Sequence, residues 1–464
     1  MTRPSEPLRM QRSTHVVIWD QLGEAPTVDG TTVYWNEFFL PTRSASKISL
    51  PQYVEDNSED LKQRFLAFVR EIGESQIAGK STIEHLRTLP EFSYWWMTLF
   101  ACKRWSTTSN IIEAVRLLAL EDILHETKPT KVSVATDHRA IRSVIRNWCM
   151  QSKIEFESLI VSNSESSPNF QLSRLTPRPV AAVLVLMREI LRRINIPKNM
   201  MRHDNLTDVV LIDYLTRFDV DSALHGKFDS GFWSDLVNTL DNAGQKTLFF
   251  HQFVANSITP NRKATGRILE GLNSKSKTQR HFLLDARLSI GAVLKTLFMY
   301  FRLVRTRFRI RKIKHSFFPT GSQLNLWKLF KREWLDSLSG STAILHSLAI
   351  SELDATIVKI PSCRTVLYLM ENQPWEMAFI QLWKQRRSEP LVGVPHSSIR
   401  YWDLRYFTDS DSYHFDLASH PPSPDTVAIN GPAALRSLQV EGIPATQMTE
   451  VEALSYLYLD EVQP

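Results

Sequence analysis

The sequence predicts an α/β protein built on a mostly parallel, Rossmann-like sheet with helical insertions. Short runs of β-branched and aromatic residues recur along the chain and are separated by longer helical patterns. Most of these runs are continuously apolar rather than alternating, as expected when helices cover both faces of a parallel sheet. Several runs pass through a tight turn directly into a helical pattern, which is the mark of βαβ units.

Eight apolar runs are predicted as strands. They are Val16–Asp20, Lys131–Asp137, Ile154–Ile160, Val209–Leu215, Thr247–Phe253, Thr365–Asn372, Leu391–His396 and Val427–Asn430. Two regions, 59–125 and 260–346, break the alternation and are predicted to be helical. We interpret both as insertions in one large lobe at 1–425, which leaves 426–464 as the start of a second lobe or a C-terminal tail.

Length and composition describe an ordinary globular chain. Its 464 residues are too many for one minimal domain, and 43% hydrophobic with 22% charged residues can bury a real core. The three cysteines are widely spaced and form no CxxC, which excludes a disulfide scaffold and a cysteine zinc site. No apolar signal-peptide core and no uncharged run of about 20 residues occurs, so we expect a cytoplasmic protein that does not span a membrane.

Chemistry in parallel sheets gathers at the carboxyl ends of strands. Titratable and amide side chains stand at nearly every predicted strand end: Asp20, Asp137, His138, Asp213, Tyr214, His251, Glu371, Asn372, His396, Asn430. For any single one, a helix cap or a turn is the more common explanation. The collection is more informative than its members, and it places a candidate site at this edge.

The segment after Thr365–Asn372 carries two carboxylates around a predicted helix start. Glu371 and Asn372 end the strand, Pro374 suits the first helical turn, and Glu376 falls in that same turn. The pair has the chemistry to position a sugar hydroxyl or to act as a general base. We interpret Glu376 as a capping residue, favoured by the helix dipole, and Glu371 as the functional carboxylate.

The next strand leads into a loop rich in charge. His396 is a candidate base or a donor to a phosphate oxygen. Arg400 and Arg405 suit bidentate contact with phosphate or carboxylate. The alternative is a local ion pair between Asp403 and either arginine that only shapes the loop.

Asn430 and Gly431 follow the last predicted strand, where the glycine permits a close backbone approach to an anion. The chain contains no GxGxxG, GxxxxGK[ST], HExxH or GxSxG, so a dinucleotide fingerprint, a P-loop, a zinc protease and an α/β-hydrolase are unsupported. Asp409-Ser410-Asp411 matches DxD in letters, but its polar setting favours a surface turn. We therefore predict no metal and no cofactor.

A basic segment with interleaved aromatic residues lies apart from these strands. Its cations are Arg302, Arg305, Arg307, Arg309, Arg311, Lys312 and Lys314. Three interpretations compete: a core helix with a solvated edge, a nucleic-acid patch, and an interfacial helix on anionic lipid. Among the functional ones we prefer the membrane surface, because the apolar face is broad and no nucleic-acid-binding motif accompanies it.

Several long motifs occur together in this chain. They are FSYWWMTLF (Phe92–Phe100), VVLIDYL, ENQPWE, GVPHSSIRYWDLRYF, PDTVAINGPAALRSL and VEALSYLYL. In this order they resemble a bacterial family of surface-carbohydrate biosynthesis proteins, related to glycosyltransferases of the two-lobed GT-B type. The motifs are long and cover most of the chain. Residues on them are Glu371, Asn372, Trp375, Glu376, His396, Arg400, Asp403, Arg405 and Asn430.

The resemblance implies an acceptor lobe that ends with the strands at Thr365–Asn372 and Leu391–His396. It also implies a nucleotide-sugar donor, a lipid-linked or growing glycan acceptor, and work at the inner membrane face. GT-B enzymes hold the nucleotide in a second Rossmann lobe, yet only a short stretch follows Val427. Either that lobe is missing or the halves divide nearer the middle. Ser455, where the family carries Arg, is a second departure.

The sequence thus supports two hypotheses. The first is a glycosyltransferase-like enzyme of surface polysaccharide (lipopolysaccharide or capsule) synthesis, peripheral on the inner membrane, with His396 or Glu371 as base or sugar-positioning group. The second is a non-catalytic glycan-binding or assembly component that keeps one lobe and needs a partner protein to complete its site. A single sheet that ends with Val427–Asn430 as its last strand would favour the second hypothesis, and two sheets that face a cleft would favour the first.

Overall fold

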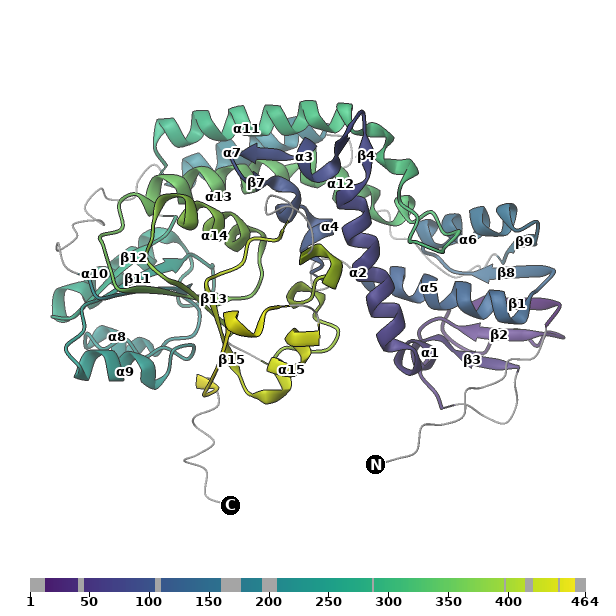
Figure 1. Cartoon of the computed structure of the whole chain (residues 1–464), viewed down its shortest axis with the longest axis horizontal. Helices are drawn as coiled ribbons and strands as arrows, with labels where there is room; N and C mark the ends of the chain where they lie inside the picture. The colour runs from purple at the N-terminus through teal and green to yellow at the C-terminus, as the bar shows by residue number, and fades with distance from the viewer. Residues whose placement is uncertain are drawn as a thin grey trace, which may run out of the picture. The chain divides into compact units, whose positions relative to one another are not determined.

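The computed structural model describes residues 13–40, 46–104, 110–159, 177–193, 207–285, 288–395, 398–413, 420–440 and 443–454. The chain divides into two compact units, and each is built on its own parallel sheet (Figure 1). The first unit comprises Met1–Thr82, Lys103–Arg174 and Ile310–Trp334, and the second comprises Ile83–Cys102, Leu175–Arg309 and Leu335–Pro464. The α/β fold class with Rossmann-like parallel sheets is confirmed.

The first unit holds a five-stranded sheet in the order β3-β2-β1-β8-β9. Its strands are β1 (His15–Trp19), β2 (Thr31–Tyr34), β3 (Lys47–Ser49), β8 (Lys131–Ala135) and β9 (Glu155–Ser158). Every pairing is parallel. Counted along the chain within this unit, the order is 3-2-1-4-5, as in Rossmann sheets.

The helices of the first unit include a buried one, α5, on which two others pack. They are α1 (Leu50–Asp56), α2 (Ser58–Glu74), α5 (Asn110–Thr127), α6 (Arg139–Gln151) and the 3₁₀ turn η4 (Arg311–His315); a short hairpin joins β4 (Gln76–Ile77) to β5 (Lys80–Ser81). Leu117, Leu118 and Ala119 are consecutive in α5 and all buried, so this helix is covered on more than one face.

The second unit holds a seven-stranded sheet in the order β12-β11-β10-β13-β14-β15-β16. Its strands are β10 (Val209–Tyr214), β11 (Thr247–Gln252), β12 (Gln279–Leu283), β13 (Thr365–Met370), β14 (Leu391–Pro395), β15 (Thr426–Asn430) and β16 (Met448–Val451). All six pairings are parallel. Within this unit the order is 3-2-1-4-5-6-7, the Rossmann order with one further strand.

Helices cover both faces of the larger sheet. In Figure 1, α8 (Val220–Leu224) and α9 (Asp235–Asn242) lie on one side of β10–β12, and α13 (Ser341–Ile357) and α14 (Pro374–Arg386) lie on the other. α7 (Arg178–Arg193) and α11 (Ile290–Arg309) both pack on α13. The remaining elements are α10 (Arg262–Lys275), α15 (Pro432–Val440), α4 (Leu99–Cys102), η1 (Tyr94–Met97), η5 (Leu404–Tyr406), η6 (Ser410–Tyr413), η8 (Ala445–Gln447) and the hairpin β6 (Arg87–Leu89)–β7 (Phe92–Ser93). Two of the unit boundaries fall within helices, one in α3 (Thr82–His85) and one in α12 (Trp327–Ser339).

The eight predicted strands are all present, but their grouping differs from the expectation. The expected boundary between 425 and 426 falls inside the second unit, because β15 pairs with β14. The first four predicted strands belong to two separate sheets, and the two compact units alternate along the chain. A run of β-branched residues indicates a strand but says nothing about which strands pair.

The expected helical region 260–346 also contains a strand. β12 has the sequence QRHFL, which holds no β-branched residue and gives no strand signal. Its place between α10 and α11 is set by pairing with β11, by burial of Gln279 and His281, and by the ring contact of His281 with Phe228. β2, β3 and β16 were missed for a similar reason, since each has only three or four residues.

Candidate functional site

The second unit reverses its strand order between β10 and β13. Strands β11 and β12 lie on one side of this pair, and β14 to β16 lie on the other. In open parallel sheets, ligands bind at the carboxyl ends of the strands at such a switch point, because the two following loops diverge there. The loops here begin after Tyr214 and after Met370, so the predicted carboxylates at Glu371 and Glu376 lie at this position.

Glu376 is the most deeply buried carboxylate of the site. Its side chain is fully buried, and Oε2 accepts hydrogen bonds from the backbone N–H groups of Glu371 (3.0 Å) and Asn372 (2.9 Å). Burial raises the pKa of Glu376 to about 8, although these two bonds act in the opposite direction. Glu376 therefore holds the β13–α14 turn from within.

Tyr214 and Trp375 connect β10 to α14. The Tyr214 hydroxyl donates to Oε1 of Glu376 (3.4 Å) and accepts from Nε1 of Trp375 (3.0 Å), while the two rings meet edge to face. Burial and the neighbouring carboxylates Glu376 and Glu371 raise the pKa of Tyr214 well above its usual value. The phenol thus stays protonated and presents a fixed hydroxyl at the switch point.

Glu371 is the partly exposed carboxylate of the site. Its Oε2 accepts from Nε2 of Gln373 (2.8 Å) and lies 3.8 Å from Nη1 of Arg405. Asn372 adopts a left-handed backbone conformation with φ of 51°, and its side-chain amide donates to the carbonyl of Arg405 (3.1 Å). The turn after β13 is thereby fastened to the loop after β14.

Arg405 is held by Asp403 in a two-pronged ion pair. Nε and Nη2 donate to the two carboxylate oxygens at 2.8 and 2.7 Å. The structure therefore contains the loop-shaping ion pair that we weighed as the alternative for this segment. Arg400 differs, because its side chain is exposed and no ion pair of the described residues involves it. Of the two predicted phosphate-binding arginines, Arg400 is the one open to a ligand.

The structure does not test every predicted residue of this edge. His396 lies outside the described residues. Asn430 ends β15, and its Oδ1 is buried with no hydrogen-bond partner in the described part of the chain. Gly431 follows with φ of 103°, a left-handed conformation that suits glycine.

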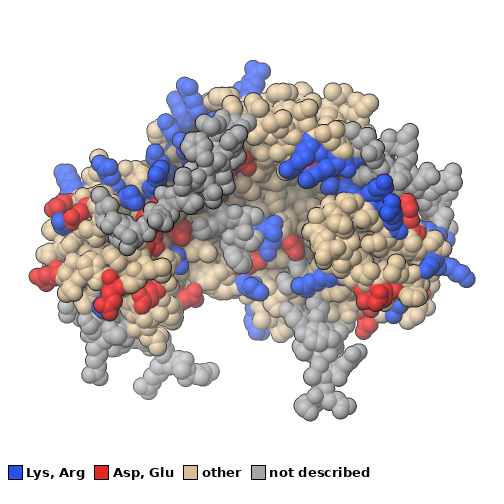
Figure 2. All heavy atoms as spheres, turned by 180° about the vertical axis from the view of Figure 1, so that it is seen from behind, with Lys and Arg blue, Asp and Glu red and all other residues tan. Residues whose placement is uncertain are grey.

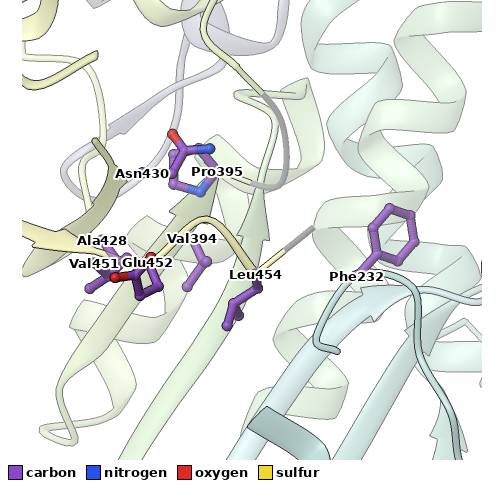
Figure 3. Close-up of a pocket in the computed structure, with 8 residues that line it drawn as sticks. All are labelled: Phe232, Val394, Pro395, Ala428, Asn430, Val451, Glu452 and Leu454. Carbon is purple, nitrogen blue, oxygen red and sulfur yellow. The ribbon is translucent and has the colours of Figure 1, made fainter. Parts of the chain in front are cut away.

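A small pocket borders the ends of β14, β15 and β16. It has an open volume of about 280 Å³. Figure 3 shows its eight lining residues: Phe232, Val394, Pro395, Ala428, Asn430, Val451, Glu452 and Leu454. Pro395 and Asn430 lie together at the ends of their strands in this view, while Phe232 comes from the segment between α8 and α9. Most of the lining is apolar, with one amide and one carboxylate as polar groups.

Four buried polar side chains of the second unit are linked in a row, and this cluster was not predicted from the sequence. Trp233 donates to Asp213 (2.9 Å), Asp213 bonds Nδ1 of His251, and Nε2 of His251 lies 3.0 Å from Nδ1 of His281. All four side chains are buried, and burial lowers the pKa of His281 well below its usual value. From the sequence, Asp213 and His251 were placed at strand ends. His281 was not found, because this residue lies in β12, which has no strand-like sequence pattern.

The first unit places a smaller polar cluster at its own switch point between β1 and β8. Asp20, just after β1, accepts from Thr136 after β8 (2.6 Å) and from Asn36 (2.6 Å). Burial raises the pKa of Asp20. Nε1 of Trp35 donates to Glu113 nearby (2.8 Å). The strand-end prediction for Asp20 thus coincides with the position where a parallel sheet binds ligands.

The predicted basic segment forms the end of α11 and η4. Arg302 donates to the carbonyl of Arg87 (2.7 Å) and Arg307 to Oγ of Ser339 (2.8 Å), so these two contact the protein. The other five, Arg305, Arg309, Arg311, Lys312 and Lys314, are exposed. No helix among the described residues is long and apolar enough to cross a membrane. Nor does any group of three or more His, Cys, Asp or Glu in that part of the chain suit a metal ion.

No family model matches the sequence, and no curated protein does. Among solved structures, the chain is similar to tyrosyl-tRNA synthetase of Leishmania major in complex with tyrosinol. The identity is 9%, the TM-score is 0.17, and the alignment covers 74% of this chain and 63% of the synthetase. The chain thus spans less than two thirds of that protein, and a likeness this weak carries no argument about fold or function.

Proposed function

We propose that this chain is a GT-B-like glycosyltransferase of bacterial surface polysaccharide synthesis. It would transfer a sugar from a nucleotide-sugar donor to a lipid-linked or growing glycan, while working at the membrane surface. The observation that carries the proposal is the pair of separate parallel sheets, each in Rossmann order and each with a polar cluster at its switch point. This architecture is what the resemblance to a two-lobed enzyme requires.

The two sheets also change the assignment of the lobes. From the sequence, we expected the strands at Thr365 and Leu391 to end an acceptor lobe. They instead lie in the second unit, with β15 and β16 beside them. Because GT-B enzymes hold the nucleotide in the second lobe, we assign the donor site to the β10–β13 switch point. The acceptor site is then assigned to the first unit, around Asp20.

The side chains at the donor site divide into positioning and contacting groups. Glu376 and Tyr214 are fixed to the protein, so they hold the turn that presents the others. Glu371 keeps part of its carboxylate exposed and is suited to accept hydrogen bonds from sugar or ribose hydroxyls. His396 stays a candidate base at the end of β14. Arg400 supplies a cation for phosphate.

The helix α14 starts at this site, and its positive end favours an anion. A charged carboxylate in the first turn would cancel part of that field. Glu376 occupies the first turn, but burial raises its pKa to about 8, which favours the neutral carboxyl group. The helix end therefore keeps its attraction for the diphosphate of a donor.

The alternative of a non-catalytic component that keeps a single lobe loses its main argument. That hypothesis arose because only a short stretch follows Val427. The first unit supplies a second parallel sheet from residues that we had assigned to the same lobe.

The proposal is tested by a thermal-shift screen of the purified chain against CMP-, UDP-, GDP- and dTDP-sugars. A ligand that binds only the folded state at about a hundred times its Kd adds roughly 2.7 kcal/mol, which such a screen detects. We expect one nucleotide class to stabilise the wild-type chain. Stabilisation by none of them would overturn the proposal.

A matched pair of variants locates the site. Glu371→Gln removes the charge of the partly exposed carboxylate beside Arg405. Glu270→Gln makes the same change at an exposed position of α10 and serves as the control. We expect the first variant to reduce the shift and the control to preserve it. Equal shifts in both variants would place the donor away from the β10–β13 switch point.

A further inference from the structure

The helix α11 exposes a continuous apolar stripe. Ile290, Leu294, Phe298, Phe301 and Phe308 recur at helical spacing, and each is more than half exposed, with Phe298 at 69%. The opposite side of the same helix is buried against α13 through Met299 and Leu303 among others. A surface helix of a globular protein normally turns such residues inward. α11 is apolar on its solvent side as well.

The helix α7 repeats this arrangement beside the same partner. Val180, Leu184, Met187 and Leu191 are spaced four, three and four residues apart, and all four are exposed, with Leu191 at 68%. Its inner face packs on α13. Burial, and after it the positive charge of Arg178 at the start of α7, lower the pKa of Arg307 near the end of α11. The two exposed apolar stripes therefore belong to helices that both pack on α13 within one unit, and exposed apolar stripes of this kind mark interaction surfaces.

The exposed charged side chains of these two helices are all basic. α11 contains no Asp or Glu, and the one acidic residue of α7, Glu189, is turned inward to Arg193. Arg305 and Arg309 are exposed on α11, and no carboxylate of the described residues forms an ion pair with either. Figure 2 shows the upper edge of the molecule, where α11 lies, occupied by tan and blue atoms.

We infer that α7 and α11 form a docking surface for a bilayer of anionic phospholipid. Apolar side chains with a fringe of arginine are the features of interfacial helices, whose binding combines apolar insertion with attraction to anionic headgroups. Each basic residue near such a surface adds further attraction. A protein partner of matching shape would need acidic residues opposite Arg305 and Arg309, whereas a phospholipid surface supplies negative charge without a specific geometry.

This inference assigns the membrane contact to residues outside the donor site, and it requires no nucleotide sugar. It extends the sequence-based expectation in one respect. The contact is made by two helices with apolar stripes, and Arg305 and Arg309 act as their fringe. Of the cations expected to face lipid, Arg302 and Arg307 instead contact the protein.

The test is co-sedimentation of the full chain with vesicles of phosphatidylcholine, alone or with 30% phosphatidylglycerol, at low and high salt. We expect binding to the anionic vesicles that weakens as salt is added, because the charge attraction is screened. Two variants separate the apolar contribution to vesicle binding from the electrostatic contribution. Leu294→Ser/Phe298→Ser/Phe301→Ser removes the apolar part, and Arg305→Glu/Arg309→Glu reverses two charges. We expect each to weaken binding at least tenfold.

The matched control is Lys263→Glu/Arg267→Glu, which makes the same charge change on exposed residues of α10. It should bind as the wild type does. No binding to anionic vesicles, or an equal loss in the control, would overturn the inference. The inference would also be overturned if the wild-type chain dimerised without binding vesicles and the triple serine variant did not dimerise. The nucleotide-sugar screen contains no lipid, so failure of either test leaves the other inference standing.

Discussion

Tyr214 at the end of β10 donates a hydrogen bond to Glu376 in the first turn of α14, with 3.4 Å between the two oxygens. This contact spans the switch point of the larger sheet, where β10 pairs with β13. Glu376 is fully buried and Tyr214 is half-buried, and burial raises the pKa of each. The polar centre of the candidate site is therefore also part of the core, and its titration is linked to stability.

The first prediction concerns pH. The pKa of Glu376 rises from about 4.5 in the unfolded chain to about 8 in the folded protein. The folded state therefore binds the extra proton between these values, so this group's contribution to stability is full below pH 4.5 and is lost as pH rises through 8. Glu376→Gln mimics the neutral acid and should lose less stability than wild type between pH 5.5 and 8.5.

Urea unfolding of both proteins at the two pH values measures the effect of Glu376. Burial also raises the pKa of Glu352, so the difference between variant and wild type, not the wild-type slope, isolates Glu376. Identical pH dependence in the two proteins would show that this carboxyl titrates normally.

The second prediction separates the Tyr214 hydroxyl from its ring. Tyr214→Phe keeps the edge-to-face contact with Trp375 but removes the acceptor of the indole N–H and the donor to Glu376. We expect a loss of about 1–3 kcal/mol, because buried polar groups are left without partners. A double-mutant cycle with Glu376→Gln should give a non-zero coupling energy. Additive effects would mean that the two side chains do not interact.

The third prediction concerns acid sensitivity. Burial keeps the pKa of His281 well below 6.5, so on acidification the unfolded chain takes up a proton that the folded protein refuses. Its contribution is therefore present above pH 6.5 and lost as pH falls. His281→Phe should be less stable at pH 7.5, since His251 loses a partner, yet should lose less stability between pH 7.5 and 5.5. A steeper decline in the variant would contradict the assignment.

The fourth prediction contrasts two arginines of one loop. Arg405→Ala leaves the partly buried Asp403 without its two-pronged partner and should lower stability by about 1–3 kcal/mol. Arg400→Ala alters an exposed side chain and should change stability by less than about 0.5 kcal/mol. Arg400→Ala should nevertheless weaken nucleotide-sugar binding by roughly tenfold, because one charge-assisted hydrogen bond to phosphate would be lost. Calorimetry of both variants, with and without the donor, measures this contrast.

The fifth prediction uses two glycines of the second unit. A Cβ added at Gly393 in β14 would lie 2.9 Å from Sδ of Met370 and 3.0 Å from the Tyr368 hydroxyl, so Gly393→Ala should cost about 1–3 kcal/mol. Gly271 in α10 has open space around it, and Gly271→Ala should gain up to about 1 kcal/mol from helix propensity. Thermal unfolding of the pair should give shifts of opposite sign.

Local pattern was sufficient for the strands that carry the candidate site. Val209–Leu215, Thr365–Asn372 and Leu391–His396 are dense in β-branched and apolar residues, and the structure has strands at all three. Glu371 and Asn372 were placed at a strand end for the same reason. The same pattern predicted a cap at Glu376, because a carboxylate in a first helical turn is usually solvated. Only the fold shows it buried beneath the preceding turn.

The sequence by itself thus determined eight of the strands, the parallel α/β class and the polar character of the strand ends, because these follow from periodicity and from the chemistry of neighbouring residues. The tertiary structure decided which strands share a sheet, where the chain divides, and which polar groups are buried together. Those features depend on contacts between residues far apart in the chain, such as Tyr214 with Glu376 and His251 with His281. Contacts between residues so far apart leave no local pattern in the sequence. One sequence alone therefore could not predict which strands pair or which polar groups are buried together.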